Sequence, residues 1–259
     1  MKLQLTDKVK ATLFAILSFA ILIAVWIGVS AAHPDFLPSP AACLARFQAM
    51  LQRPISKVTV FGHVWDSLKR VLCAVVVASL IGIPVGLGMG WNKKIKAAIS
   101  PIFEFLRPIP PIAWIPLVIL WFGVGEFSKV FLVFIGAVIP VIMNTYTGVT
   151  MVDPILLNVG RIYKATGVQS LREIVLPAAL PAIFAGVKTA VSSGWMIVLA
   201  AEMMASKSGV GFLITRGMEA YDVAMVICGM LLIGIVGYLI SISLSALERR
   251  LCPWKTSIQ

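Results

Sequence analysis

The residues in this sequence that could do chemistry are few, and two of them are charges inside an apolar run. Lys188 and Glu202 lie near the two ends of segment 182–205, and four side chains that could contact a solute lie between them: Ser192, Ser193, Trp195 and Met196. Asn144 lies near the end of an earlier apolar run. Charges in such runs are costly and usually face protein or water. This set could line a path for a small anion, or it could pack helices against one another.

Each of the two charges has two interpretations. Lys188 could extend its ammonium group to the inner membrane surface, or it could line the anion path. Glu202, in the string AAEMM, could form a structural ion pair or a helix cap, or it could take part in an outer gate. Both alternatives stay open for each residue.

Catalysis by this chain is not expected. Its two histidines, His33 and His63, fall in an expected outer loop, where each would be solvated or would cap a helix, and no set of nucleophile, base and orienting residue is evident. No G-x-x-x-x-G-K-[ST] loop is present, since the nearest fragment, GVKT at 186–189, lacks the leading glycine. The glycine pairs in GVGEF and GVGF are expected to form turns at the outer membrane face. We therefore expect that this chain does not hydrolyse ATP.

The four cysteines, Cys43, Cys73, Cys228 and Cys252, form no C-x-x-C pair and have no histidine nearby. Cys73 and Cys228 fall inside apolar runs. The pattern predicts neither a disulfide framework nor a metal site.

The segments that hold these residues have a composition suited to lipid. Hydrophobic residues make up 59% of the chain and charged residues 13%, against roughly 45–50% and 25% in soluble domains. A net charge of +11 would suggest nucleic acid if it lay on a soluble face, but the basic residues form short tracts beside apolar runs, such as NKKIK at 92–96 and ERR at 248–250. We interpret these tracts as cytoplasmic flanks of membrane helices and expect no nucleic-acid partner.

The sequence predicts an all-α integral membrane protein with about six transmembrane helices, or five as the alternative. A crossing needs about 20 apolar residues, and six segments qualify or come close: 11–30, 71–90, 109–123, 130–146, 182–205 and 223–244. The first ends in VSAAHP, which could pass for a signal-peptidase site, but its length and the spans that follow favour a retained helix.

The orientation follows from the basic residues between the spans. With the N-terminus inside, the inner segments, which include Arg107 and Lys255, hold more lysines and arginines than the outer ones. Lys69 and Arg70, beside the second span, do not fit this bias. Both termini are therefore expected in the cytoplasm, and the stretch between the fourth and fifth spans becomes an inner loop.

Two patterns describe how the helices pack. Small residues recur every four positions in the second and fifth spans, which lets helix backbones approach closely: Gly82, Gly86 and Gly90, then Ala182, Gly186, Ala190 and Gly194. The stretch RPIPPIAWIP at 107–116 cannot be a regular helix throughout, because each proline removes a backbone donor. We expect a kinked or broken helix at the cytoplasmic entry to the third span, where it lines a path or is merely a structural kink.

The inner loop has the periodicity of an amphipathic helix. Its apolar residues fall on one helical face, and its polar residues, including Asp153 and Arg161, fall on the other: Val152, Ile155, Leu156, Val159, Ile162 and Tyr163 form the apolar face. Gly167 permits a turn, a second short helix follows, and Pro177 and Pro181 mark the return to the membrane. Such a helix could lie in the membrane interface or fill a groove on a soluble partner.

The end of this loop, IVLP followed by AALP at 174–181, resembles the cytoplasmic signature of permease subunits in binding-protein-dependent ABC importers. In that family the signature opens with Glu-Ala-Ala, has a glycine four residues after the last alanine, closes on Leu-Pro, and docks into the ATPase. Counting back places Asn158 at the acid and Lys164 at the glycine, which this chain lacks. The resemblance implies these coupling residues: Asn158, Val159, Gly160, Ile162, Tyr163, Lys164, Gly167, Ile174, Leu176 and Pro177.

Residues 107–129 and 194–214 are similar to permeases for taurine, alkanesulfonates, nitrate and bicarbonate, and the tail RRLCPW at 249–254 looks most like taurine permeases. The resemblance implies a single permease domain over 1–259, with an N-terminal helix and outer loop (1–66), a bundle (67–247) containing the coupling segment 151–181, and a cytoplasmic tail (248–259). It also implies an inner-membrane homodimer with two copies of a cytoplasmic ATPase and a periplasmic or lipid-anchored binding protein. ATP and Mg would bind the ATPase, and this chain would hold no cofactor.

Three questions of function stay open. Taurine or another alkanesulfonate is the favoured substrate, with nitrate, bicarbonate or a small aromatic acid as alternatives, and the path residues would be Asn144, Ser192, Trp195, Met196 and Glu202. A secondary carrier that needs no ATPase would be favoured by inverted repeats, and none is evident. A membrane scaffold would leave the broken helix and the buried charges without a role.

Overall fold

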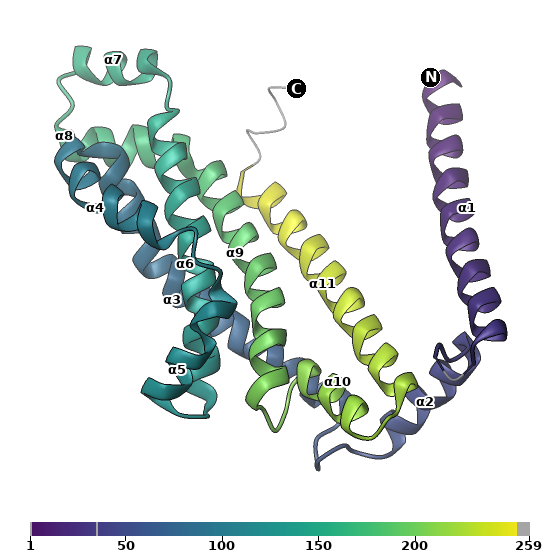
Figure 1. The fold of residues 1–259 in the computed structure, drawn as a ribbon. Coiled ribbons are helices and arrows are strands. Elements are labelled where there is room, and N and C mark those ends of the chain that lie inside the picture. Colours follow the sequence, from purple (N-terminus) through teal and green to yellow (C-terminus); the bar gives the residue numbers. More distant parts are fainter. Residues whose placement is uncertain (1, 35, 253–259) are drawn as a thin grey trace. The chain divides into compact units, whose positions relative to one another are not determined.

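The computed structural model describes residues 2–34 and 36–252, so Lys255 and the end of the predicted tail lie outside the described residues. Within these ranges the chain is helical, with one isolated β-bridge between Ile55 and Val58 and no β-strand. The elements are α1 (Lys2–Ala32), α2 (Pro40–Gln52), α3 (Val60–Trp91), α4 (Lys93–Leu106), a 3₁₀-helix η1 (Pro111–Trp114), α5 (Ile115–Phe122), α6 (Glu126–Thr150), α7 (Pro154–Ile162), α8 (Gly167–Gln169), a π-helix η2 (Ser170–Val175), α9 (Leu176–Ala205), α10 (Val210–Glu219) and α11 (Val223–Leu251) (Figure 1). The predicted all-α class is confirmed.

The chain forms two compact units. The first contains residues 1–60 and 213–231. In it, Arg46 on α2 forms an ion pair with Asp222, whose carboxylate also accepts a hydrogen bond from the Met225 N–H at the start of α11. The Cys228 thiol donates to the Cys43 carbonyl, 3.2 Å away. The second unit contains residues 61–212 and 232–259, and it holds the features described below.

Five helices are long and apolar enough to cross a membrane, and a bent pair would make six, which confirms the predicted number. The five are Thr12–Ala32, Val60–Trp91, Glu126–Thr150, Gly167–Met204 and Val223–Leu251. The bent pair is Lys93–Leu106 with Pro111–Phe122, which meet at 83°. The third predicted span therefore differs from 109–123, because α5 has only eight residues and needs α4 to complete a crossing.

Close packing of α3, α6 and α9 forms the core of the second unit (Figure 1). A Cβ added at Gly86 would lie 2.6 Å from the Thr145 side chain on α6, and one at Gly186 on α9 would lie 2.7 Å from Asn144 on the same α6. Gly82, Gly90 and Gly194 make similar contacts. The small-residue pattern therefore predicted which faces of these helices meet.

The proline-rich stretch breaks the helix, as predicted. Helix α4 ends at Leu106, and η1 begins at Pro111. A Cβ added at Gly136, near the middle of α6, would lie 3.1 Å from the Pro111 ring. Arg107 therefore lies at the break within the bent pair, and the expected position of this break at the cytoplasmic entry stays a prediction.

The segment before α9 also corrects two expectations. Lys164, and not Gly167, makes the turn after α7, because it has φ of 55° whereas Gly167 begins α8. Pro177 and Pro181 lie inside one continuous helix from Gly167 to Met204 and do not separate a loop from the span, and where this helix enters the membrane stays a prediction. The π-helical turn η2 makes this possible, because it shifts the backbone hydrogen bonds just before Pro177, where Leu176 N–H bonds to Leu171.

Candidate functional site

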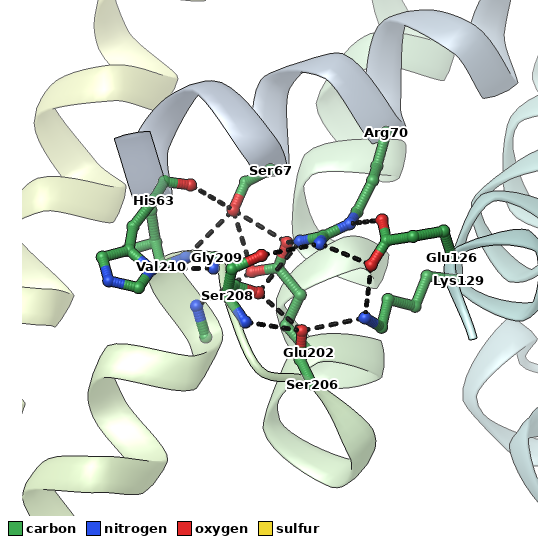
Figure 2. Close-up of polar contacts among 11 residues, drawn as sticks. His63, Ser67, Arg70, Glu126, Lys129, Glu202, Ser206, Ser208, Gly209 and Val210 are labelled. Carbon is green, nitrogen blue, oxygen red and sulfur yellow. Dashed lines mark hydrogen bonds and ion pairs between the residues drawn. The ribbon is translucent and has the colours of Figure 1, made fainter. Parts of the chain in front are cut away.

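Arg70 is the centre of a polar cluster that joins α3, α6, α9 and the turn before α10 (Figure 2). Most of it is buried, but the Glu126 side chain is 66% exposed. We call this the Arg70 cluster; its members are His63, Ser67, Arg70, Glu126, Lys129, Glu202, Ser206 and Ser208. The Arg70 Nε and Nη2 atoms donate to the two Glu126 oxygens at 2.6 and 2.8 Å, and Nη1 donates to Glu202 at 2.6 Å. Ser208 accepts the two remaining N–H groups at 3.0 Å. All five guanidinium donors are therefore used.

The charges of the Arg70 cluster balance. Glu202 is 1% exposed and Arg70 is 4% exposed. Burying either charge without the other would be very costly in free energy. Lys129 donates to Glu126 at 2.8 Å and to Ser206 at 2.9 Å. Two cations therefore face two carboxylates, which explains why Arg70 did not fit the charge bias of membrane flanks.

Three side chains of this cluster also cap the start of α10. The Gly209, Val210 and Gly211 N–H groups donate to His63 Nδ1 at 3.1 Å, to Ser67 Oγ at 2.9 Å and to Glu202 Oε2 at 3.0 Å. A helix N-terminus has such free donors and favours a carboxylate. Of the open alternatives, the structure shows the ion pair and the cap for Glu202 and capping for the fully buried His63; a part in a gate stays a prediction.

Sequence reasoning missed Ser67, Glu126 and Lys129. The spacing of His63, Ser67 and Arg70 places them on one face of a helix, and Glu126 and Lys129 are three residues apart. These spacings were the available signal. The pairing itself joins residues 56 and 132 positions apart, which no local pattern shows.

The predicted path residues do not lie together at one site. Asn144 donates to the Pro140 carbonyl at 2.9 Å and contacts Gly186, where α6 meets α9. Trp195 is buried, and its indole N–H donates to the Ile233 carbonyl on α11 at 3.3 Å. Ser192 and Met196 are exposed on another face of α9. The structure therefore brings only Ser192 and Met196 to a shared face, and Glu202 belongs to the Arg70 cluster.

Lys188 is held by α11. Its ammonium donates to the Ser245 hydroxyl at 2.8 Å and lies 3.8 Å from a Glu248 oxygen. Both partners lie near the end of α11 that carries the basic tract ERR. The side chain therefore ties α9 to α11.

Helix α7 exposes apolar side chains although it lies at one end of the bundle (Figure 1). Ile155, Ile162 and Tyr163 are 67%, 77% and 83% exposed, and Leu156 and Val159 are also exposed. Beside this face lies a groove of about 440 Å³ lined by Leu156, Val159, Glu173, Ile174, Pro177 and Ala178. Exposed apolar surface of this kind marks a site of interaction.

The other face of α7 is anchored. A Cβ at Gly160 would lie 2.6 Å from the Cδ1 atom of Ile174, so α7 packs closely against η2 at this point. After α7, Thr166 and Gln169 form a reciprocal capping box that starts α8. Helix α7 is therefore fixed in place at the start of the long helix and does not hang from a loose loop.

The predicted coupling residues divide between these two faces. Asn158, Val159, Ile162, Tyr163 and Lys164 are exposed, whereas Gly160 is buried and Ile174 and Leu176 are half-buried. Lys164, at the position where the signature has glycine, adopts the left-handed conformation that glycine prefers.

Comparison with known proteins gives one family over most of the chain. Residues 78–256 match the family described as the binding-protein-dependent transport system inner membrane component. The chain is 34% identical to the taurine transport system permease protein TauC of Escherichia coli over 93% of its length and 90% of that protein. It is 32% identical to the nitrate import permease protein NrtB of Synechocystis over 91% of its length and 88% of that protein.

The fold is similar to that of a solved transporter. The chain matches a structure of the MetNI methionine ABC transporter in an inward-facing conformation, with a TM-score of 0.67. The match covers 80% of this chain and 98% of that chain at 20% sequence identity.

Proposed function

Because this chain belongs to the family of binding-protein-dependent transport system inner membrane components, which are the permease subunits of ABC importers, we propose that it forms the path by which a small anion crosses the inner membrane. The chain would be a non-catalytic subunit, and ATP hydrolysis on a separate subunit would drive the transport. The observation that carries this proposal is the anchored helix α7, whose apolar side chains are exposed. Such a surface suits a soluble partner that moves the helix.

The long helix supplies a mechanical connection. It runs without interruption from Gly167 to Met204, which is 38 residues, or about 57 Å. Its first turns pack against α7, and its last turn carries Glu202 in the Arg70 cluster. A displacement of α7 by the ATPase would therefore reach the outer ends of α3, α6 and α9, where this cluster would act as part of the gate.

The proposed assembly is the one that the family suggests. Two copies of this chain would form one domain pair, bind two ATPase subunits through the coupling segment 151–181, and receive cargo from a periplasmic or lipid-anchored binding protein. ATP and Mg would bind only the ATPase, and no nucleic acid would take part. Both termini would lie in the cytoplasm, consistent with the basic tracts at 92–96 and 248–250.

Taurine or another alkanesulfonate is the proposed cargo. The relatives named for taurine and for nitrate differ by only two percentage points in identity to this chain, so nitrate is the alternative that the same test must include. Uptake of labelled taurine and labelled nitrate should be measured in a strain that lacks this transporter and in the same strain carrying it. Uptake of taurine alone would support a sulfonate as the cargo. Uptake of nitrate alone would show that the cargo is nitrate instead.

Docking is tested by charging the exposed face of α7. Ile162→Asp with Tyr163→Asp should release the ATPase during purification and abolish uptake, because two carboxylates cannot enter an apolar groove without loss of hydration. Met218→Asp with Tyr221→Asp is the matched control, since both residues are exposed and neither belongs to the coupling segment. Full co-purification of the ATPase with the α7 variant would sink the proposal.

A further inference from the structure

Cys43 and Cys228 are two buried residues in contact, although 185 positions separate them in the sequence. Each is 3% exposed, and both are free thiols in the structure. The Cys228 thiol donates to the Cys43 carbonyl at 3.2 Å, so the two residues meet where α2 packs against the start of α11. Both belong to the first unit, whereas Cys73 and Cys252 belong to the second.

Neighbouring contacts hold these two helices in one register. Arg46, one turn after Cys43, pairs with Asp222, and its Nη2 atom lies 3.5 Å from the sulfur of Met225, one turn before Cys228. A step forward along α2 therefore meets a step back along α11, as in an antiparallel pair. Because Arg46 is bound at two points, the two cysteines are kept opposite each other.

The two cysteines can form a disulfide after a small movement. The 3.2 Å contact limits the separation of their α-carbons to roughly 8 Å, and a disulfide joins α-carbons that are about 4.4–6.8 Å apart. Turning the Cys228 sulfur from the Cys43 carbonyl to the Cys43 sulfur breaks one weak thiol hydrogen bond. The spacing of the cysteines in the sequence did not predict this pair, because they lie on separate helices.

We propose that Cys43 and Cys228 are a redox site, whose thiols oxidise to an intramolecular disulfide at the outer side of the membrane. Helix α2 follows the first candidate span, so it lies on the side opposite the N-terminus, which is the outer side in the orientation proposed above. Disulfides persist in such compartments, whereas the cytoplasm keeps thiols reduced. The bond ties α2 to α11 and stabilises the first unit, because a cross-link between distant positions restricts the unfolded chain.

The oxidant is a second disulfide, and oxidised glutathione serves as the probe. One cysteine thiolate attacks a sulfur of the probe and releases a glutathione thiolate; the other cysteine thiolate then attacks the mixed disulfide and releases the second. The protein loses two electrons and two protons, and one glutathione disulfide becomes two glutathione thiols. Burial and, after it, the Asp222 carboxylate raise the pKa of the Cys43 thiol, so the attacking thiolate is scarce at neutral pH and the reaction is slow.

The first test identifies the oxidised thiols in the whole transporter. Membranes are treated with oxidised glutathione at about pH 8, free thiols are blocked in denaturant, and the digested chain is analysed by mass spectrometry. The wild type should give one linked pair of peptides that joins Cys43 to Cys228, and Cys43→Ser should give none. Cys73→Ser with Cys252→Ser is the control and should keep the link. Free thiols at both positions, glutathione on each, or a link to Cys73 or Cys252 would overturn the proposal.

The second test locates the site with the same probe, which is charged and does not cross membranes. Right-side-out vesicles should form the link, and inside-out vesicles from the same cells should form about a tenth as much or less. A link that forms only in inside-out vesicles would contradict the outer position.

The third test measures what the bond does. The oxidised wild type should unfold at a higher temperature than the same protein treated with dithiothreitol, whereas Cys43→Ser should unfold at one temperature after either treatment. Equal unfolding temperatures for the oxidised and reduced wild type would overturn the stabilising role of the bond.

Discussion

The Arg70 cluster and the segment 151–175 lie at the two ends of the helix Gly167–Met204, and they treat their side chains in opposite ways. In the cluster, three charged groups that belong in water, Arg70, Lys129 and Glu202, are buried, and each finds a partner within the chain. In the segment, apolar groups that belong inside a protein are exposed. The first region is complete in one chain, whereas the second has the surface of a protein that needs another subunit.

This difference shows which contacts stabilise the subunit itself and which surface is left for a partner. The cluster joins α3, α6, α9 and the start of α10, so its contacts stabilise one arrangement of these helices. The segment has its rigid contacts on one side only, at Gly160 and Ile174, and leaves the other side for a partner. A subunit that transmits motion needs both: a firm attachment to the helix and a free surface.

The largest effect is expected from breaking the cluster. Arg70→Met leaves Glu202 buried without its cation, which should lower the free energy of unfolding by about 3–5 kcal/mol. Thermal unfolding of the purified transporter in detergent measures this loss. Arg216→Met is the control, because Arg216 and Glu219 form an exposed pair worth about 0–1 kcal/mol.

Removing Glu202 together with Arg70 restores the charge balance of the cluster and should recover most of the lost free energy of unfolding. Arg70→Met combined with Glu202→Met removes both charges, and apolar replacement of a buried pair is often neutral. A double variant as unstable as Arg70→Met alone would mean that the helix contacts depend on something other than this pairing.

The sequence predicts the close contacts of this fold better than its charge pairs. The glycines at 82, 86 and 90 revealed a packing face because the period of a helix is local information. Arg70 could not be assigned to Glu202, since 132 residues separate them. The part of α4 in the third candidate span was also missed, because proline predicts that a helix ends but not how the helices on its two sides are arranged.

A smaller effect is expected at the turn that orients α7. Lys164 has φ of 55°, a conformation that costs a residue with a Cβ about 1–2 kcal/mol. Lys164→Gly should therefore raise the free energy of unfolding by roughly 0.5–1 kcal/mol, after the greater chain entropy of glycine is subtracted. Arg161→Gly, inside α7, should lower it by about 1 kcal/mol. A decrease for Lys164→Gly would show that the lysine side chain, and not the backbone, matters at this position.

The smallest change in stability is expected for the α7 variant, although this variant should abolish uptake. Ile162 and Tyr163 are 77% and 83% exposed, so Ile162→Asp with Tyr163→Asp buries no charge in the isolated permease. The free energy of unfolding, measured without the ATPase, should stay within about 0.5 kcal/mol of wild type. With the ATPase present, the wild type should gain thermal stability and this variant should not, because only a subunit that binds its partner is stabilised by it. A loss of several kcal/mol without the ATPase would place these side chains in the core of the subunit, and the contrast with the Arg70 cluster would fail.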